Sequence, residues 1–348
     1  MSKAKPEIKT IAVMRFSALG DVAMTVPVLK RVLDENPGLE IIMVSDSRLE
    51  GIFSGIGRLT FAGYDLKGKY KGIRGIYRIY DHLNTHYEFQ AVADLHGVLR
   101  THLVRFLLWI AGKQFAFIHK GRLEKKALIR VDDKILKPLP HSTERYAEVF
   151  RKLDFKVSSA NYYTLGKGQY SQWFDKASNL SEPIHIGFAP FARHAAKMYN
   201  LDRFKEVIKY FDRERYRIHL FGGTRAEQLV IKQWEKDFKF VVPSTLGTGF
   251  KSELEMMRKL KVMVSMDSAN MHLASLVDVP VISIWGPTHP YAGFYGFNQD
   301  PANAIQADLS CRPCSVFGNK NCWRGDHACM QEISAERVIK QVKKIIGE

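Results

Sequence analysis

The chain has 348 residues, of which 46% are hydrophobic and 25% charged, so it is long enough for two globular domains. Lysine and arginine outnumber aspartate and glutamate by 52 to 36, and this net charge of +16 predicts anionic partners. No apolar run approaches the roughly 20 residues that span a bilayer, and the N-terminal stretch lacks a signal-peptide core. We therefore expect a cytoplasmic protein that does not cross a membrane.

The front half alternates short β-branched strands with amphipathic helices. Strands are expected at IAVMRF (11–16), EIIMVS (40–45) and EFQAVADL (88–95), with a helix over residues 21–36. Continuous apolar strands are typical of parallel sheets that helices cover on both faces. Residues 1–165 are therefore predicted to form a Rossmann-like domain.

The turn after the first strand carries a candidate catalytic group. Gly20 permits a tight turn into the helix, and Asp21 follows at the helix start. A carboxylate held there can act as a general base, whereas the spacing by itself favours a simple helix cap. Both interpretations remain open from these residues alone.

Two further groups of polar residues in the front half are candidates for binding an anionic acceptor. Residues 66–80 hold five cations and no acid, namely Lys67, Lys69, Lys71, Arg74 and Arg78. They either bind phosphate groups or form a solvated helix face whose apolar residues Ile73, Ile76, Tyr77 and Tyr80 turn inward. The end of the third strand supplies Asp94 and His96, followed by Arg100, with ordinary turn polarity as the alternative.

The charge is not accompanied by any recognisable nucleic-acid motif. No RRM, KH, helix-turn-helix or zinc-finger pattern is present, so no nucleic-acid partner is expected. A basic nucleic-acid-binding protein is kept as the non-enzymatic alternative.

The alternation of strands and helices restarts after a polar, turn-rich stretch at 158–183, which predicts a domain boundary near 165–180. Strands are expected at 184–190, 217–223, 240–243, 261–266 and 280–286, and helices at 201–211, 226–238, 252–260 and 270–277. This pattern predicts a second Rossmann-like domain over 180–330, followed by a C-terminal helix within 331–348 that Ser334 caps. Two such domains in tandem would bring the carboxyl ends of both sheets to a shared cleft.

The segment MDSANMHLASL in the second half suits a diphosphate. A strand ends just before Asp267, and the backbone amides of Ser268, Ala269 and Asn270 open a helix with His272 one turn further on. Asp267 would then face a neutral or cationic group, because phosphate repels a carboxylate. The alternative is an aspartate that caps the helix and a buried structural histidine.

Three segments together resemble the heptosyltransferase family, the bacterial ADP-heptose:lipopolysaccharide glycosyltransferases. They are FSALGDV near the N-terminus, APFARHAAKMYN, and DSANMHLASL with PVISIWGPTHP. The resemblance implies an α/β GT-B fold of two doubly wound, parallel-sheet domains. It also implies inverting transfer of a heptose from ADP-L-glycero-D-manno-heptose to the Kdo-lipid A inner core of lipopolysaccharide.

The resemblance also implies roles for individual residues. Asp21 corresponds to the catalytic base, Lys197 to the lysine on the donor phosphates, and Glu227 to the acid on the donor ribose. The donor loop corresponds to Asp267, Ser268 and His272. The sequence departs from the family at Phe191, Ala192 and Ala269, which stand where threonine or glycine is usual.

The implied partners are a nucleotide-sugar donor and an anionic glycolipid acceptor, met by peripheral contact at the cytoplasmic face of the inner membrane. No cofactor and no catalytic metal are expected, because Lys197 and a helix end can neutralise the departing diphosphate. Another GT-B nucleotide-sugar enzyme, such as an epimerase, is the enzymatic alternative.

All four cysteines fall within nineteen positions, as Cys311, Cys314, Cys322 and Cys329. A C-x2-C pair followed by two more cysteines suggests a structural zinc site, but the second pair lacks that spacing. A cluster of reduced thiols is the expectation and zinc the alternative.

Overall fold

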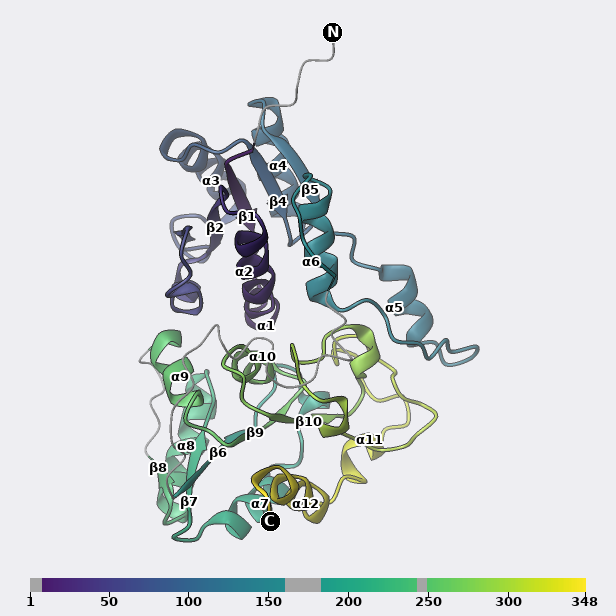
Figure 1. Ribbon diagram of the computed structural model, residues 1–348. Coiled ribbons are helices and arrows are strands. Elements are labelled where there is room, and N and C mark those ends of the chain that lie inside the picture. Colours follow the sequence, from purple (N-terminus) through teal and green to yellow (C-terminus); the bar gives the residue numbers. More distant parts are fainter. Residues whose placement is uncertain (1–7, 160–182, 243–248) are drawn as a thin grey trace. The chain divides into compact units, whose positions relative to one another are not determined.

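The chain folds as two compact units in the computed structural model, which describes residues 8–159, 183–242 and 249–348 (Figure 1). Within the described residues the first unit holds 8–120 and 142–159, and the second holds 121–141, 183–242 and 249–348. The domain boundary expected near 165–180 lies outside the described residues.

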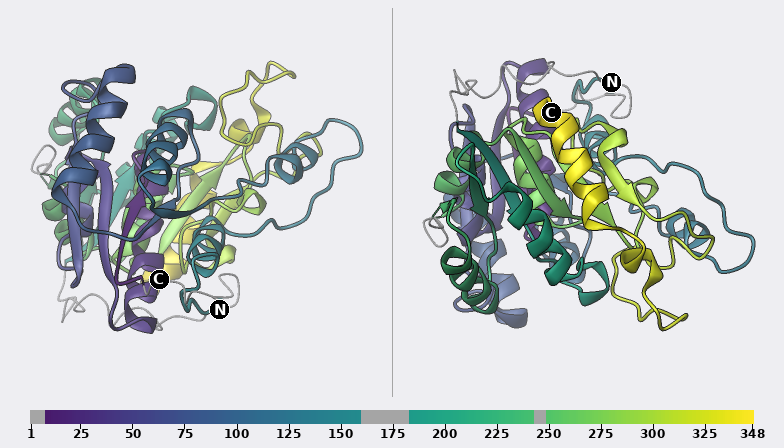
Figure 2. Two further views of the ribbon diagram at one scale, coloured as in Figure 1. Left: turned by 90° about the horizontal axis from the view of Figure 1, so that it is seen from above. Right: turned by 90° about the horizontal axis from the view of Figure 1, so that it is seen from below.

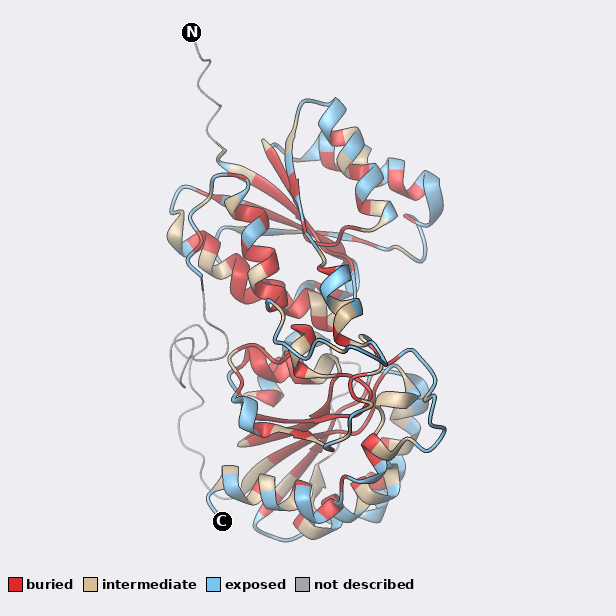
Figure 3. Ribbon diagram, turned by 90° about the vertical axis from the view of Figure 1, so that its right-hand side faces the viewer, coloured by how far each residue is buried: buried red, intermediate tan, exposed pale blue. Residues whose placement is uncertain are grey.

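The first unit is built on a five-stranded parallel sheet in the order β3-β2-β1-β4-β5. Its strands are β1 (Thr10–Met14), β2 (Glu40–Asp46), β3 (Leu59–Tyr64), β4 (Ala91–Asp94) and β5 (Gln114–Phe117). The central strand β1 is completely buried from Ile11 to Met14, and the red strands in Figure 3 show the same for the middle of the sheet. Burial on both faces explains the continuous apolar run that predicted this strand.

Helices cover both faces of this sheet. They are α1 (Leu19–Ala23), α2 (Thr25–Glu35), η1 (Ser47–Phe53), α3 (Gly72–His86), α4 (Leu99–Ile110) and α6 (Ser142–Arg151). The helix expected over 21–36 is in fact two, with Met24 between them. Pro27 accounts for the break, because it lacks the N–H that a continuous helix would use to reach the carbonyl of Ala23.

The second unit is built on a six-stranded parallel sheet in the order β11-β10-β9-β6-β7-β8. Its strands are β6 (Ile184–Ala189), β7 (Tyr216–Leu220), β8 (Val241–Val242), β9 (Val262–Met266), β10 (Val281–Trp285) and β11 (Ala304–Gln306). All except β11 were predicted. The edge strand β11 has only three residues, too few to form a recognisable apolar pattern.

The helices of the second unit follow the predicted order. They are η3 (Ala195–Lys197), α7 (Leu201–Phe211), α8 (Arg225–Asp237), α9 (Phe250–Met257), α10 (Ala269–Leu276), η4 (Pro290–Ala292), η5 (Pro301–Asn303), α11 (Ala328–Gln331) and α12 (Ala335–Ile346). The C-terminal helix α12 contacts α7, β9 and β10, so it is part of this unit (Figure 2, right). Ser334 caps it as predicted, since its Oγ accepts a hydrogen bond from the Arg337 amide.

A segment of the front half belongs to the second unit. Residues 121–141, which include α5 (Arg122–Leu128), leave the first unit and return to it. The Leu139 amide donates to the carbonyl of Tyr291 at 2.9 Å, and His141 Nε2 donates to the carbonyl of Tyr295 at 2.7 Å. The sequence did not predict this excursion.

No helix in the described part of the chain combines the length and the apolar character that a bilayer crossing requires.

Candidate functional site

Asp21 is the third residue of α1, just beyond the carboxyl end of β1. Its Oδ2 lies 2.5 Å from Nη2 of Arg15 and accepts a hydrogen bond of 3.3 Å from the Ala18 amide. Among the described residues, Oδ1 has no hydrogen-bond partner. The carboxylate therefore caps the helix and is also held by a cation, with its second oxygen left for another group.

Arg15 is a residue of the candidate site that the sequence interpretation missed. It is buried, donates to the Leu95 carbonyl at 2.6 Å and lies 5.6 Å from the centre of the Tyr146 ring. The Tyr146 hydroxyl in turn donates to the backbone carbonyl of Asp21 at 3.3 Å. A buried guanidinium needs a carboxylate partner, so an arginine at the end of an otherwise apolar strand could have indicated this pair.

His96 lies near Asp21 at the carboxyl end of the first sheet. Burial, and then the positive charge of Arg15, lowers the pKa of His96 to about 3, so the ring is neutral at pH 7. Asp21 and Arg100 also act on this ring, so the structure brings predicted base and acceptor residues together. Within the described chain the buried Nδ1 of His96 has no hydrogen-bond partner, which is a feature expected at a ligand site.

Asp94 has a structural role in the same turn. Its carboxylate is fully buried, accepts hydrogen bonds from the amides of His96 and Gly97 at 2.9 and 2.8 Å, and pairs with Arg105 at 2.9 Å. Direct contact between Asp94 and an acceptor stays a prediction.

The basic segment 66–80 has an exposed apolar side. Lys67, Lys69 and Lys71 are exposed, as are the two arginines that follow. The helix α3 buries Ile76, but Ile73 and Tyr77 are exposed, so the interpretation with all four apolar residues inward is wrong. The buried face passes through positions 75, 76, 79 and 83, which places Ile73 and Tyr77 on the outer side of the helix.

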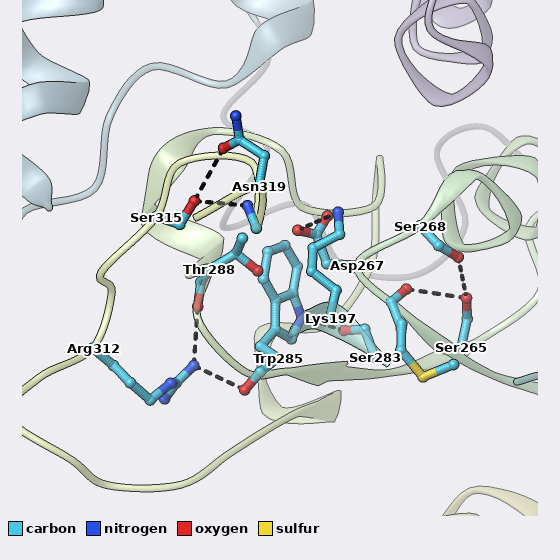
Figure 4. Close-up of polar contacts among 12 residues, drawn as sticks. Lys197, Ser265, Asp267, Ser268, Ser283, Trp285, Thr288, Arg312, Ser315 and Asn319 are labelled. Atoms are coloured by element: carbon cyan, nitrogen blue, oxygen red, sulfur yellow. Dashed lines mark hydrogen bonds and ion pairs between the residues drawn. The ribbon is translucent and has the colours of Figure 1, made fainter. Parts of the chain in front are cut away.

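Lys197 and Asp267 meet at the carboxyl ends of two neighbouring strands of the second unit, β6 and β9 (Figure 4). Lys197 Nζ lies 3.1 Å from Asp267 Oδ2, and the two side chains are only 13% and 9% exposed. Asp267 does face a cation, as expected, and that cation is the lysine predicted to bind the donor phosphates.

The start of α10 is free of a side-chain cap. Ser268 is the N-cap residue, but its Oγ lies 3.0 Å from Ser265 Oγ and makes no capping hydrogen bond. The alternative in which Asp267 caps the helix is therefore wrong. Ala269 and Asn270 are partly exposed, whereas His272 is buried, as its structural alternative expected. Uncapped first-turn amides next to a lysine suit an anionic group.

Glu227 belongs to a capping box at the start of α8. Its Oε2 accepts hydrogen bonds from the amides of Gly223 and Thr224 at 2.7 and 2.9 Å, and Thr224 Oγ1 accepts one from the Glu227 amide at 3.2 Å. The T-x-x-E pattern of this cap is readable from the sequence and was missed. The ribose contact of Glu227 stays a prediction.

The loop after β10 is fixed by Arg312, another residue that sequence reasoning missed. Its buried guanidinium donates to the backbone carbonyls of Trp285 at 3.0 Å, Thr288 at 3.1 Å and Ala307 at 2.7 Å (Figure 4). Trp285 Nε1 donates to Ser283 Oγ at 2.8 Å, which fixes the ring. This network makes the WGPT loop a rigid neighbour of the Lys197 and Asp267 pair.

A second loop packs directly on the stem of Lys197. Gly318 has φ +73°, and a Cβ at this position would lie 2.3 Å from Lys197 Cγ. Ser315 Oγ accepts a hydrogen bond from the Gly318 amide at 2.9 Å, and it also lies 3.3 Å from Asn319 Oδ1 (Figure 4). The cysteine-rich part of the chain thus positions the lysine.

The four cysteines are free thiols. Burial raises the pKa of Cys314, and it raises that of Cys329 to about 11, so both are protonated at neutral pH. The described residues contain no group of three or more His, Cys, Asp or Glu side chains that could hold a metal ion. The zinc alternative stays a prediction.

Comparison with known proteins places the chain in a family. The family model described as glycosyltransferase family 9 (heptosyltransferase) matches residues 78–323. The chain belongs to this family. One curated relative is lipooligosaccharide heptosyltransferase 2 of Campylobacter jejuni subsp. jejuni serotype O:6, with 26% identity over 198 residues. That alignment covers 56% of this chain and 57% of the relative, so the chain spans little more than half the length of this relative.

Solved structures of family 9 proteins share the fold over nearly the whole chain. The glycosyl transferase family 9 protein of Veillonella parvula has a TM-score of 0.72 at 20% identity, with 97% of each chain covered. The E. coli heptosyltransferase WaaC, solved with ADP, has a TM-score of 0.70 at 20% identity and covers 97% of this chain and 99% of its own. The two parallel-sheet units are therefore those of a GT-B fold, as predicted.

Proposed function

We propose that this family 9 chain transfers a heptose, with inversion, from ADP-L-glycero-D-manno-heptose to the Kdo-lipid A inner core of lipopolysaccharide. The names of its relatives, which are lipooligosaccharide and lipopolysaccharide heptosyltransferases, support this proposal. The observation that carries it is the Lys197 and Asp267 pair beside the uncapped start of α10.

The second unit supplies the donor site in this proposal. The ammonium of Lys197 and the first-turn amides of α10 hold the diphosphate and stabilise the negative charge that develops as it departs. Asp267 accepts one hydrogen bond from the Lys197 ammonium and so orients it, and the remaining N–H groups of the ammonium are left for phosphate oxygens. Because these groups supply the neutralising charge, we propose that the transfer needs no metal and no other cofactor.

Asp21 supplies the base. Its Oδ2 is fixed by Arg15 and the Ala18 amide, so Oδ1 is the atom that accepts the proton of the attacking acceptor hydroxyl. The neutral His96 ring, with its unpartnered Nδ1 within the described chain, helps to orient that hydroxyl. The proposal places the reaction at the cytoplasmic face of the inner membrane, where the acceptor lipid is presented.

The test offers purified protein ADP-heptose and Kdo-lipid A and follows the mass of the lipid. A gain of one heptose is expected for the wild type, and Asp21→Asn should lower the rate by about 10²- to 10⁴-fold while ADP affinity changes little. Asp46→Asn is the matched control, because Asp46 is the last residue of its strand and pairs with an arginine, Arg48, at 2.8 Å.

Two results would contradict the proposal. A wild-type rate for Asp21→Asn would remove this carboxylate from the mechanism. Donor consumption without any lipid acceptor would favour the epimerase-like alternative.

A further inference from the structure

The helix α4 has two opposite apolar faces. Thr101, Val104 and Leu108 are buried on the inner one. The outer one carries a stripe at spacings of four, three and four residues, formed by Leu99, Leu103, Phe106 and Ile110. Leu99, Phe106 and Ile110 are 73%, 52% and 64% exposed, and Trp109 beside them is 54% exposed. A soluble helix normally carries polar residues on its outer face, so this stripe calls for a partner.

The neighbouring helix α3 extends this apolar surface. The helix α3 contacts α4. The helix α3 connects β3 to β4 and α4 connects β4 to β5, and both connections run in the same direction across the sheet order β3-β2-β1-β4-β5. Right-handed crossovers place them on one face of the sheet. The exposed residues Ile73 and Tyr77 of α3 therefore lie on the same side of the unit as the stripe of α4.

Not every exposed aromatic residue nearby belongs to this surface. Phe115 and Phe117 of β5 are partly exposed, but the guanidinium of Arg105 lies 5.1 and 4.3 Å from their ring centres. That arginine also pairs with Asp94, so it covers the two rings and is not available to a partner. The outer surface of α3 and α4 is therefore defined by Ile73, Tyr77, Leu99, Leu103, Phe106, Trp109 and Ile110.

Cations outnumber acids around this surface, where the exposed Asp81 of α3 is an acid one turn beyond Tyr77. Residues 66–80 contain five cations and no acid, and residues 95–120 contain Arg100, Lys113 and Lys120 besides the paired Arg105, with no acid. Lys67, Lys69 and Lys71 are exposed just before α3, and Arg74 and Arg78 are exposed in its first half. Exposed Leu, Phe, Ile and Trp side chains beside clustered cations are the features that bind a helix to the surface of an anionic bilayer.

We infer that the outer surface of α3 and α4 docks on an anionic lipid bilayer, with the apolar stripe of α4 inserted among the head groups. The cations of residues 66–80 then bind lipid phosphates, which gives these lysines a membrane role rather than a role in holding one acceptor molecule. The choice of partner rests on the proposed lipid acceptor, but docking itself needs neither donor nor acceptor.

The first experiment uses vesicles of phosphatidylglycerol and phosphatidylcholine, with phosphatidylcholine alone as the uncharged comparison. The wild type should co-sediment with the anionic vesicles and be released as salt rises. Phe106→Ser/Ile110→Ser should lower the partition coefficient by about tenfold or more, because two apolar side chains no longer enter the interface. The control Val131→Ser/Leu229→Ser removes side chains that are 74% and 64% exposed elsewhere and should bind as the wild type does.

The charge contribution is tested in the same assay. Lys71→Gln/Arg74→Gln should weaken binding at low salt by about tenfold or more, since each cation near such a surface contributes about fivefold. Lys340→Gln/Lys344→Gln removes two exposed lysines of α12 and should change binding by less than about twofold.

Insertion has a spectroscopic signature. Brominated phosphatidylglycerol should quench the fluorescence of Trp109, and Trp109→Phe should lose this quenching. Trp323→Phe, which removes an exposed tryptophan of the second unit, should keep it. Unchanged vesicle binding by Phe106→Ser/Ile110→Ser, or no binding by the wild type, would overturn the inference.

Two further outcomes separate this inference from its alternatives. If the apolar surface instead joins two copies of the chain, sedimentation will show a dimer that Phe106→Ser/Ile110→Ser dissociates, without any vesicle binding. If only the proposed function fails, the vesicles will still bind the wild type while no heptose is transferred. Phe106→Ser/Ile110→Ser should retain transfer to an acceptor dispersed in detergent.

Discussion

The ion pair between Lys197 and Asp267 makes a quantitative prediction, because the two partners have different expected effects on stability and on ADP binding. Unit charges 3.1 Å apart attract each other by about 5 kcal/mol at an effective dielectric constant of about 20. Removing one partner of a buried pair typically costs about 3–5 kcal/mol. Lys197→Met should therefore lower the free energy of unfolding by roughly that amount, since it leaves the Asp267 carboxylate buried without its cation.

The double variant Lys197→Met/Asp267→Asn distinguishes the structural role of the lysine from its binding role. It leaves no uncompensated charge, so most of the lost stability should return, to within about 1–2 kcal/mol of the wild type. ADP affinity should not return, because the cation is still missing. Asp267→Asn alone should keep or increase ADP affinity, since the lysine then has no competing carboxylate.

Chemical denaturation and calorimetric titration with ADP measure the two quantities separately. The exposed pair Lys205 and Asp237 is the matched control, with the same residue types at the same 3.1 Å but with side chains 40% and 33% exposed. Lys205→Met should cost less than about 1 kcal/mol. Wild-type ADP affinity in Lys197→Met/Asp267→Asn would refute the assignment of Lys197 to the donor diphosphate.

Two further predictions concern the second unit. Gly318→Ala should lower ADP affinity by about tenfold, because the new Cβ would displace the stem of Lys197. The control Gly325→Ala lies at φ +79° with open space around it, so it should lower only the free energy of unfolding, by about 1–2 kcal/mol. His141 is buried, and burial lowers its pKa from the ordinary 6.5 to about 4. As the pH falls, this histidine is therefore protonated near pH 6.5 in the unfolded chain but only near pH 4 in the folded chain. The contribution of His141 to the free energy of unfolding should thus be complete above pH 6.5 and fall by about 3 kcal/mol as the pH drops to 4, so His141→Gln should lose less stability than the wild type over this range in thermal melts. An equal fall in that variant would assign the acid sensitivity to other groups.

The sequence was informative where local pattern decides the structure. Continuous apolar runs predicted the central strands, because a strand buried on both faces needs no polar alternation. The turns at Asp21 and Asp267 were also predictable, since small residues between a strand and a helix indicate where the backbone must bend.

The geometry of the ion pairs was not predictable from local pattern. Lys197 and Asp267 are distant in the chain and meet only because β6 and β9 are neighbours in the sheet, an order that sequence periodicity does not encode. Arg15 and Asp21 flank a turn whose path sets the distance between them. Residues 121–141 and the short edge strand β11 likewise depend on tertiary contacts.

The excursion of residues 121–141 affects how family members can be recombined. Dividing the chain near residue 165 would not give two complete units, because residues 121–141 would remain on the front fragment. The groups that they bind, such as the carbonyls of Tyr291 and Tyr295, would be on the rear fragment. A chimaera that joins the front half of this chain to the rear half of a relative therefore brings a foreign segment onto that rear unit. Exchanging residues 121–141 together with the rear half would keep each inherited piece with the surface it evolved against.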